Sequence, residues 1–261
     1  MDLEYSGASE KFQALCEVIN RLRGPDGCPW DRVQTLESVR TYVLEEAHEV
    51  VEAIDEQDMT KLKEELGDLL IQVIFLAQLC SDKGFFGIRE VCESATQKLV
   101  SRHPHVFGDK KARDAQEVLK RWEQYKREEG KGLLDGIPKS LPALLMALRI
   151  SEKASRVGFD WPDVEGVWTK VMEEIRELRE ALDKKDSRMI EAEIGDVLFA
   201  IANIARKIGI DPETALRVML LRFRKRFKHL EEEARRLGKD LSEMSLETLD
   251  SLWEQAKRST L

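Results

Sequence analysis

Two pairs of carboxylates in the first half of the sequence, each with its members three residues apart, could do chemistry together. Glu46 and Glu49 lie in one helical pattern, and Glu65 and Asp68 lie in the next. At about 100° per residue, this separation puts both members of a pair on one face of a helix. Such carboxylates could hold a divalent cation together, or they could form ordinary solvated acidic faces.

The surroundings of Glu65 and Asp68 favour the metal site. Both residues lie in ELGDLLIQVIFLAQ, whose other side chains are almost all apolar, so this helix is not expected to turn fully to water. Burying carboxylates without compensation is costly, so the pair needs a partner. A cation shared with Glu46 and Glu49 is the simplest partner, and salt bridges to Lys or Arg are the ordinary alternative.

The same layout occurs again 128 residues further along the chain. VLEEAHEVVEAID is matched by VMEEIRELREALD, and EELGDLLIQVIFLAQ is matched by AEIGDVLFAIANIAR. Glu46 and Glu65 are 19 residues apart, and so are Glu174 and Glu193. The carboxylates of the second copy are Glu174, Glu177, Glu193 and Asp196. Because residue types and spacing are both kept, the pattern predicts one metal site in each copy.

The predicted ligands favour a hard cation. The two sets contain carboxylates and neither His nor Cys, which is typical of Mg²⁺, with Mn²⁺ as a substitute. Magnesium held by carboxylates usually completes its shell with water and substrate phosphates, which points to hydrolysis of a phosphate ester or anhydride. Spacing alone does not separate a metal ligand from a base. Glu45 and Glu173, which open the two EExxE motifs, are the candidates for a catalytic role.

Long helices must position these side chains. Leu44, Ala47 and Val51 form an apolar stripe at helical spacing, and segment 62–79 is apolar nearly all round, which predicts a central, buried helix. The short connector at 55–60 predicts that the two helices pack as an antiparallel hairpin. No segment has a convincing strand pattern. The predicted fold class is therefore all-α, with about four helices in each copy.

The repeat also predicts the domain organisation. A period of about half the chain is too long for a solenoid and indicates a tandem duplication of one domain. Residues 129–142, EGKGLLDGIPKSLP, hold three glycines and two prolines between helical patterns, as a connector should. We predict two tandem helical-bundle domains, spanning 1–133 and 134–261.

Composition narrows the function classes. The formal net charge of −8 argues against general nucleic-acid binding, which neutralises phosphates with Lys and Arg. We see neither a signal-peptide pattern nor an apolar run of roughly 18–20 residues that would cross a bilayer. The four cysteines show no CxxC spacing and are expected to be reduced thiols. We therefore expect a cytoplasmic protein that does not bind membranes.

Basic residues could contact substrate phosphates beside the metal. Arg222 and Arg226, four residues apart, share a face of a basic helix in the second copy. Lys98 and Arg102 occupy similar positions in the first copy. A solvated basic helix that pairs with nearby glutamates is the alternative for Arg222 and Arg226.

The two copies are not identical around the carboxylates. Asn203 lies seven residues after Asp196 on the same helical face and is a candidate for a ribose or phosphate contact. Its counterpart Phe75 cannot make that contact. Because of Asn203 and the denser arginine segment, the second copy is expected to contribute more of the activity.

Four tryptophans accompany these motifs. Trp253 and Trp122 could stack on a base, although a buried aromatic anchor is the commoner role. Trp30 and Trp161 lie beside Pro and Asp in turn-like contexts, so we expect them to be structural.

Together the motifs resemble those of the MazG family of nucleoside triphosphate pyrophosphohydrolases in its two-domain form. Each motif alone is weak, but their order and spacing are specific and span essentially the whole chain. They are GCPWD at 27–31, EExxE at 45–49, ELGD at 65–68, SRHPHVFGD at 101–109, SLPAL at 140–144, VGFDW at 157–161, and the second EExxE and ExGD at 173–177 and 193–196.

The resemblance implies an all-α pyrophosphohydrolase fold, a homodimer, and hydrolysis of NTPs or dNTPs between the α and β phosphates. The products would be a nucleoside monophosphate and pyrophosphate. It also implies that EExxE and ExxD supply the Mg²⁺ ligands, and it favours Arg222 and Arg226 as phosphate contacts. Two alternatives stay open: a non-catalytic regulatory module that retains a metal site, and an enzyme with narrower substrates such as dNTPs or phosphoribosyl-ATP.

Overall fold

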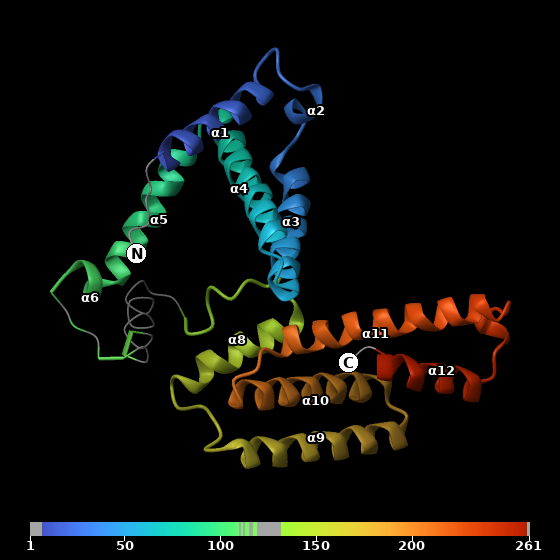
Figure 1. Ribbon diagram of the computed structural model, residues 1–261. Helices are drawn as coiled ribbons and strands as arrows, with labels where there is room; N and C mark the ends of the chain where they lie inside the picture. The colour runs from blue at the N-terminus through green and yellow to red at the C-terminus, as the bar shows by residue number, and fades with distance from the viewer. Residues whose placement is uncertain (1–6, 110, 112, 115–116, 119–131, 260–261) are drawn as a thin grey trace. The chain divides into compact units, whose positions relative to one another are not determined.

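The computed structural model describes residues 7–109, 111, 113–114, 117–118 and 132–259. Every regular element in these ranges is a helix, which confirms the predicted all-α class. The chain divides into two compact units, 1–115 and 116–261, each drawn in its own colour range in Figure 1. The predicted boundary between 133 and 134 adjoins residues 119–131, which lie outside the described residues, and it stays a prediction.

The first unit is built around a helical hairpin. Its helices are α1 (Ala8–Arg23), α2 (Pro29–Arg32), α3 (Leu36–Glu56), α4 (Met59–Asp82), α5 (Ile88–Arg102) and α6 (Pro104–Phe107). The helices α3 and α4 lie side by side, and α1 packs on α4 (Figure 1). The core joins these three helices through Ile19, Val39, Ile74, Phe75 and Leu79. Burial of each such side chain contributes about 1.5–3 kcal/mol to folding.

The second unit repeats the hairpin. Its helices are α8 (Ala143–Ser155), α9 (Val164–Lys184), α10 (Ser187–Lys207), α11 (Pro212–Arg236) and α12 (Leu246–Ser259), with a short 3₁₀ turn at Leu241–Glu243. The helices α9 and α10 form the hairpin, α8 packs on α10, and α11 pairs with α12. Val167 and Val171 are buried in the hairpin, whereas Leu230, Leu252 and Ala256 form a second cluster between α11 and α12.

Both hairpins turn through equivalent residues. Gln57 ends α3 with φ 57°, and Lys185 ends α9 with φ 55°, so each occupies the left-handed region that reverses the chain. Asp58 and Asp186 follow directly, and each side chain accepts hydrogen bonds from two backbone N–H groups of the next helix's first turn. The predicted antiparallel hairpin is therefore confirmed in both copies, and shared turn chemistry fixes it.

The helix α4 is less buried than the sequence predicted. Leu66, Leu70 and Val73 are exposed on one side, whereas Ile74 and Phe75 are buried against α1 and α3. The predicted full burial of segment 62–79 was wrong, because apolar composition does not say which faces of a helix are covered. Its central position was right, since α4 contacts α1, α3 and α5. Among the described helices, none has both the length and the apolar character needed to cross a bilayer.

Candidate metal centre

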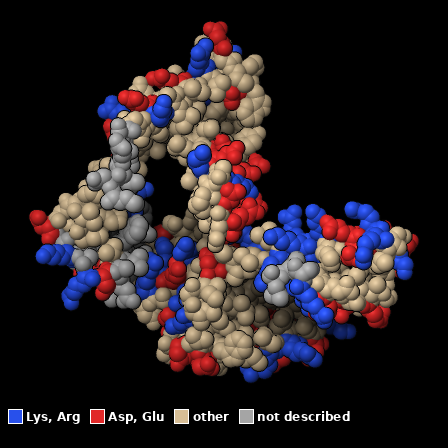
Figure 2. Space-filling view, in the orientation of Figure 1, with Lys and Arg blue, Asp and Glu red and all other residues tan. Residues whose placement is uncertain are grey.

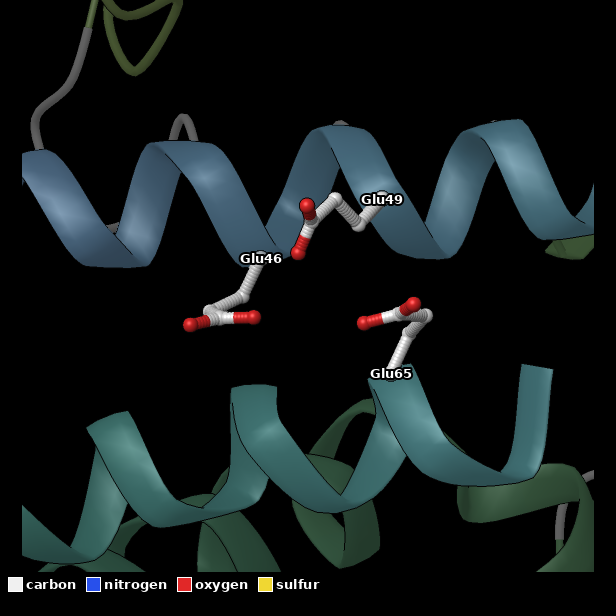
Figure 3. Close-up of side chains that lie close together, drawn as sticks. All are labelled: Glu46, Glu49 and Glu65. Atoms are coloured by element: carbon white, nitrogen blue, oxygen red, sulfur yellow. The ribbon is translucent and has the colours of Figure 1, made fainter. Parts of the chain in front are cut away.

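Three predicted carboxylates of the first unit converge between α3 and α4. Glu46 and Glu49 come from neighbouring turns of α3, and Glu65 faces them from α4. One oxygen of each lies within 4.8 Å of the others. Figure 3 shows all three side chains pointing into the space between the helices. Since all three are half-buried, this face of α3 turns toward α4 rather than out to solvent.

Repulsion within this trio opposes full ionisation. Burial raises the pKa of Glu46, and the negative charges of Asp68 and Glu49 raise it further. Burial also raises the pKa of Glu65, to which Glu49 and Asp68 again add. Asp68 therefore belongs to the same electrostatic group, although the 4.8 Å trio does not include it. A proton or a divalent cation would relieve this repulsion.

The second unit brings all of its predicted carboxylates together. Glu174 belongs to two groups with oxygens within 4.8 Å, one with Glu173 and Glu177 and one with Glu193 and Asp196. Glu174 is only 5% exposed. Burial, reinforced by Glu177 and Asp196, raises the pKa of Glu193.

One oxygen of the second cluster lacks a partner. Glu193 Oε2 is buried and makes no hydrogen bond to any part of the chain that the structure describes. Buried polar atoms are rarely left in this state. An all-carboxylate donor set with an orphaned oxygen fits a hard cation such as Mg²⁺, so the residues present are suited to the metal that the sequence predicted.

A lysine also enters the second cluster. Lys170 Nζ lies 2.8 Å from Glu173 Oε1 and 2.6 Å from Glu174 Oε1. Hydrogen bonds to both carboxylates raise the pKa of Lys170, and the bond from Lys170 lowers the pKa of Glu173. Lys170 was not among the predicted site residues. Its spacing of three and four residues from two glutamates of one helix is the signal that could have identified it.

The first cluster has different neighbours. Tyr42 occupies the position aligned with Lys170, and Gln72 occupies the position aligned with Ala200. Gln72 Nε2 donates a hydrogen bond to Glu46 Oε1 at 3.3 Å. Gln72 was also missed, because a glutamine in an apolar helix has no distinctive spacing.

The two catalytic candidates are placed differently. Glu173 is half-buried in its cluster, whereas Glu45 is exposed and lies outside the trio of the first unit. Figure 2 shows acidic side chains gathered over α3, which carries Glu45. The catalytic role of both residues stays a prediction.

The basic candidates lie on helices outside the hairpins. Lys98 is exposed and Arg102 is half-buried, both on α5. Arg222 is exposed and Arg226 is half-buried on α11, over which Lys and Arg gather in Figure 2. Their phosphate contacts stay a prediction.

Trp253 lies in an aromatic group between α11 and α12. Its ring centroid is 4.9 Å from that of Phe223, and the Arg226 guanidinium lies 6.0 Å above it. The side chain is half-buried, and it packs on the cluster of Leu230 and Leu252. This position matches the anchor role and leaves part of the indole for stacking. Trp122 lies outside the described residues.

Asn203 is buried inside the second unit. It is 1% exposed, its Nδ2 donates to the Phe199 carbonyl at 3.1 Å, and its Oδ1 accepts from Arg206 at 3.4 Å. The direct ribose or phosphate contact expected from the sequence is therefore not supported. Arg206 in turn pairs with Asp160, so Asn203 helps to orient a structural ion pair.

Comparison with known proteins places the chain among pyrophosphohydrolases. The family model described as the MazG nucleotide pyrophosphohydrolase domain matches residues 34–107 and 164–231, which contain both hairpins. The "Nucleoside triphosphate pyrophosphohydrolase/pyrophosphatase MazG" of Thermotoga maritima is 47% identical, with 94% of this chain and 95% of the relative covered. The "Nucleoside triphosphate pyrophosphohydrolase" of Escherichia coli K12 is 42% identical, with 96% and 98% covered.

An uncharacterised relative is similar over nearly the whole chain. The protein YabN of Bacillus subtilis is 45% identical, and the match covers 95% of this chain but 52% of that protein. The tandem arrangement therefore also occurs within a longer protein.

Proposed function

Because this chain belongs to the MazG nucleotide pyrophosphohydrolase family, we propose that its acidic hairpins use Mg²⁺ to hydrolyse nucleoside triphosphates between the α and β phosphates. The products are a nucleoside monophosphate and pyrophosphate. The names of the relatives support the substrate and the reaction class. The orphaned Glu193 Oε2 within the carboxylate cluster is the observation that supports the metal.

The second unit offers a complete set of roles. Glu174, Glu177, Glu193 and Asp196 would hold the cation. When bound, Mg²⁺ would neutralise phosphate charge and stabilise the departing pyrophosphate. Glu173, whose pKa is lowered by Lys170, stays ionised and can accept the proton of a water that attacks phosphorus. Lys170 holds Glu173 and Glu174 in place and adds positive charge near the phosphates.

Dimerisation and a cytoplasmic location belong to the same proposal. Ile194, Leu198 and Ile201 of α10 are exposed apolar side chains, which supports a surface covered by a second copy. The four cysteines are free thiols, which supports a reducing compartment.

Product analysis tests the activity. The full chain is incubated with each NTP and dNTP and Mg²⁺, and the products are resolved. Monophosphate with pyrophosphate is the expected result. Diphosphate with phosphate, or no turnover, would exclude the proposed reaction. Mg²⁺-dependent stabilisation without turnover would instead support a non-catalytic metal module.

Paired substitutions test the sites. Glu174→Gln with Glu177→Gln removes charge from the second cluster, and Glu46→Gln with Glu49→Gln removes it from the first. We expect Glu46→Gln with Glu49→Gln to leave more activity than the pair in the second unit. The reason is that the second unit holds the contact between Lys170 and Glu173. Glu180→Gln, on an exposed position of α9, is the matched control. If both pairs leave turnover unchanged, the carboxylates are not the active site.

A further inference from the structure

We propose that a cavity beside Glu46 in the first unit binds the nucleobase of the triphosphate and selects among bases. The inference rests on the proposed function, since it names the part of the substrate that this cavity takes. In this proposal, the first unit contributes a nucleobase pocket that has a different lining in the second unit.

The cavity adjoins the acidic trio through Glu46. Its volume is about 260 Å³, and Glu46 lines it while also facing Glu49 and Glu65. The remaining lining residues are Trp30, Asp31, Gln34, Val39, Tyr42, Ile71, Gln72 and Phe75. A triphosphate held at the trio would therefore have this cavity within reach on the Glu46 side.

The lining suits a flat heteroaromatic ring. Trp30 is 56% exposed, and its ring centroid lies 6.0 Å from that of Tyr42 with the planes at 57°. A base could stack on one ring and meet the other at an angle, as aromatic groups prefer. Trp30 was expected to be structural from its turn-like context, and its exposure beside the cavity gives it a free face for binding.

Hydrogen-bonding groups accompany the rings. Gln72 directs its amide NH₂ to Glu46, because a carboxylate accepts and does not donate. This bond leaves the Gln72 carbonyl oxygen to accept from a base. Gln34 is held by its own bonds to the Trp30 carbonyl and Ser38 hydroxyl, which tie the Trp30 segment to the start of α3.

Arg23 supports two of the residues that line the cavity. Arg23 donates to the Asp31 carbonyl at 2.6 Å, pairs with Asp82 at 2.8 Å, and lies 5.2 Å over the Phe75 ring. Its side chain is 10% exposed. Two of these contacts hold lining residues, Asp31 and Phe75, so this part of the cavity is preorganised and ordering it on ligand binding costs little.

The second unit keeps the carboxylates but has different residues at the positions that line this pocket. The residues aligned with Tyr42, Gln72 and Phe75 are Lys170, Ala200 and Asn203. The cavity at its corresponding loop is lined by residues 158–162 and includes no member of the acidic cluster. Tyr42 and Gln72 therefore distinguish the lining of the first unit, whereas Val39 and Phe75 also belong to its core.

Equilibrium binding to the full chain tests the proposal. The background carries Glu177→Gln and Glu193→Gln to weaken the second site. The probes are the non-hydrolysable α,β-methylene analogues of ATP, GTP, CTP and UTP, and inorganic tripolyphosphate, each with Mg²⁺. We expect at least one analogue to bind more tightly than tripolyphosphate. Trp30→Ala should reduce that advantage about tenfold while tripolyphosphate affinity stays unchanged.

Further variants separate recognition from folding. Trp30→Phe keeps a stacking face and should retain most of the advantage, whereas Gln72→Ala should change the order of the four bases. Phe85→Ala, at an exposed position outside the cavity lining, is the control and should change neither affinity.

Three outcomes would overturn the inference. The first is that Trp30→Ala lowers the affinity for the analogues and for tripolyphosphate equally, and the second is that it lowers neither affinity. The third is that the background chain binds none of the probes. Failure of the proposed function has a different signature. If no monophosphate is formed but base-dependent binding is lost in Trp30→Ala, the hydrolysis proposal fails and the pocket stands.

Discussion

In both hairpins, burial and mutual repulsion disfavour the ionised form of the clustered carboxylates in the folded chain. The pKa of Glu65 is raised above its ordinary value of 4.5, chiefly by burial and then by Glu49 and Asp68. A carboxyl group with a raised folded-state pKa favours folding most below its unfolded-state pKa. It loses that contribution as the pH rises through the folded-state pKa. Metal-free protein should therefore gain stability when this charge is removed.

Glu65→Gln tests that expectation at neutral and mildly alkaline pH. In EDTA, the variant should melt at a higher temperature than the parent chain at pH 8, and the difference should shrink as the pH falls toward 4.5. Added Mg²⁺ should stabilise the parent more than the variant, because one ligand is lost. The melting temperatures of the parent and the variant are compared in EDTA and in Mg²⁺, each at pH 5 and at pH 8.

Glu64→Gln is the control for this experiment. Glu64 is the exposed neighbour of Glu65 on the same helix, so its substitution removes equal charge without removing a cluster member. A larger effect of Glu64→Gln than of Glu65→Gln would show that general surface charge, and not the trio, sets the pH dependence.

Individual residues also show where sequence reasoning ends. The spacing of Glu46, Glu49 and Glu65 predicted their convergence because two adjacent helices of known period have few ways to pair. Spacing put Asn203 on the face of Asp196, but a helical face includes both the site and the core beneath it. Burial of Asn203 depends on the packing of its helix, which periodicity does not determine.

At the scale of elements, each hairpin depends on one residue in an unfavourable backbone region. Gln57 and Lys185 have φ near 57° and 55°, where a side chain with a Cβ is strained by about 1–2 kcal/mol. Glycine adopts this region freely but loses more entropy on folding. Gln57→Gly and Lys185→Gly should each raise the free energy of unfolding, by about 0.5–1 kcal/mol.

Lys184→Gly is a stringent comparison, because Lys184 is the adjacent, helical residue. The same substitution there should lower the free energy of unfolding by about 0.5–1 kcal/mol, since glycine weakens a helix. Urea titration followed by circular dichroism measures both. Equal signs at 184 and 185 would contradict the role given to the left-handed turn.

The elements themselves were largely predictable, because the repeat showed the same pattern twice. The hairpins follow from apolar periodicity and short connectors, and Asp58 and Asp186 are typical helix-capping residues. Exposure of Leu66 and Leu70 was not predictable, since helical periodicity shows which residues are apolar but not what covers them. The cavity beside Glu46 also depends on α2, whose four residues leave almost no periodic signal.

At the scale of the whole molecule, duplication has kept the carboxylates and changed what surrounds them. Glu46 has the amide of Gln72 beside it, whereas Glu174 has the ammonium group of Lys170. A cation at the second cluster meets repulsion from Lys170 until a negatively charged substrate is also bound. The two copies should therefore differ in their affinity for metal alone.

Lys170→Met removes this charge and keeps much of the side chain's length. Without nucleotide, we expect Mn²⁺ to bind the parent chain in two classes, and the variant should bind the weaker class on the order of tenfold more tightly. Electron paramagnetic resonance of free Mn²⁺ measures both classes, and Glu46→Gln with Glu49→Gln assigns the other class to the first unit.

Lys184→Met, near the end of the same helix, is the control, because Lys184 is exposed and lies outside the cluster. Unchanged or weaker Mn²⁺ binding in Lys170→Met would mean that the ammonium group does not oppose the metal. If Lys170→Met binds Mn²⁺ more tightly but turns over substrate more slowly, Lys170 assists the reaction and lowers the affinity for the metal alone. The second copy would then bind metal and nucleotide interdependently, while the first could bind its metal in advance.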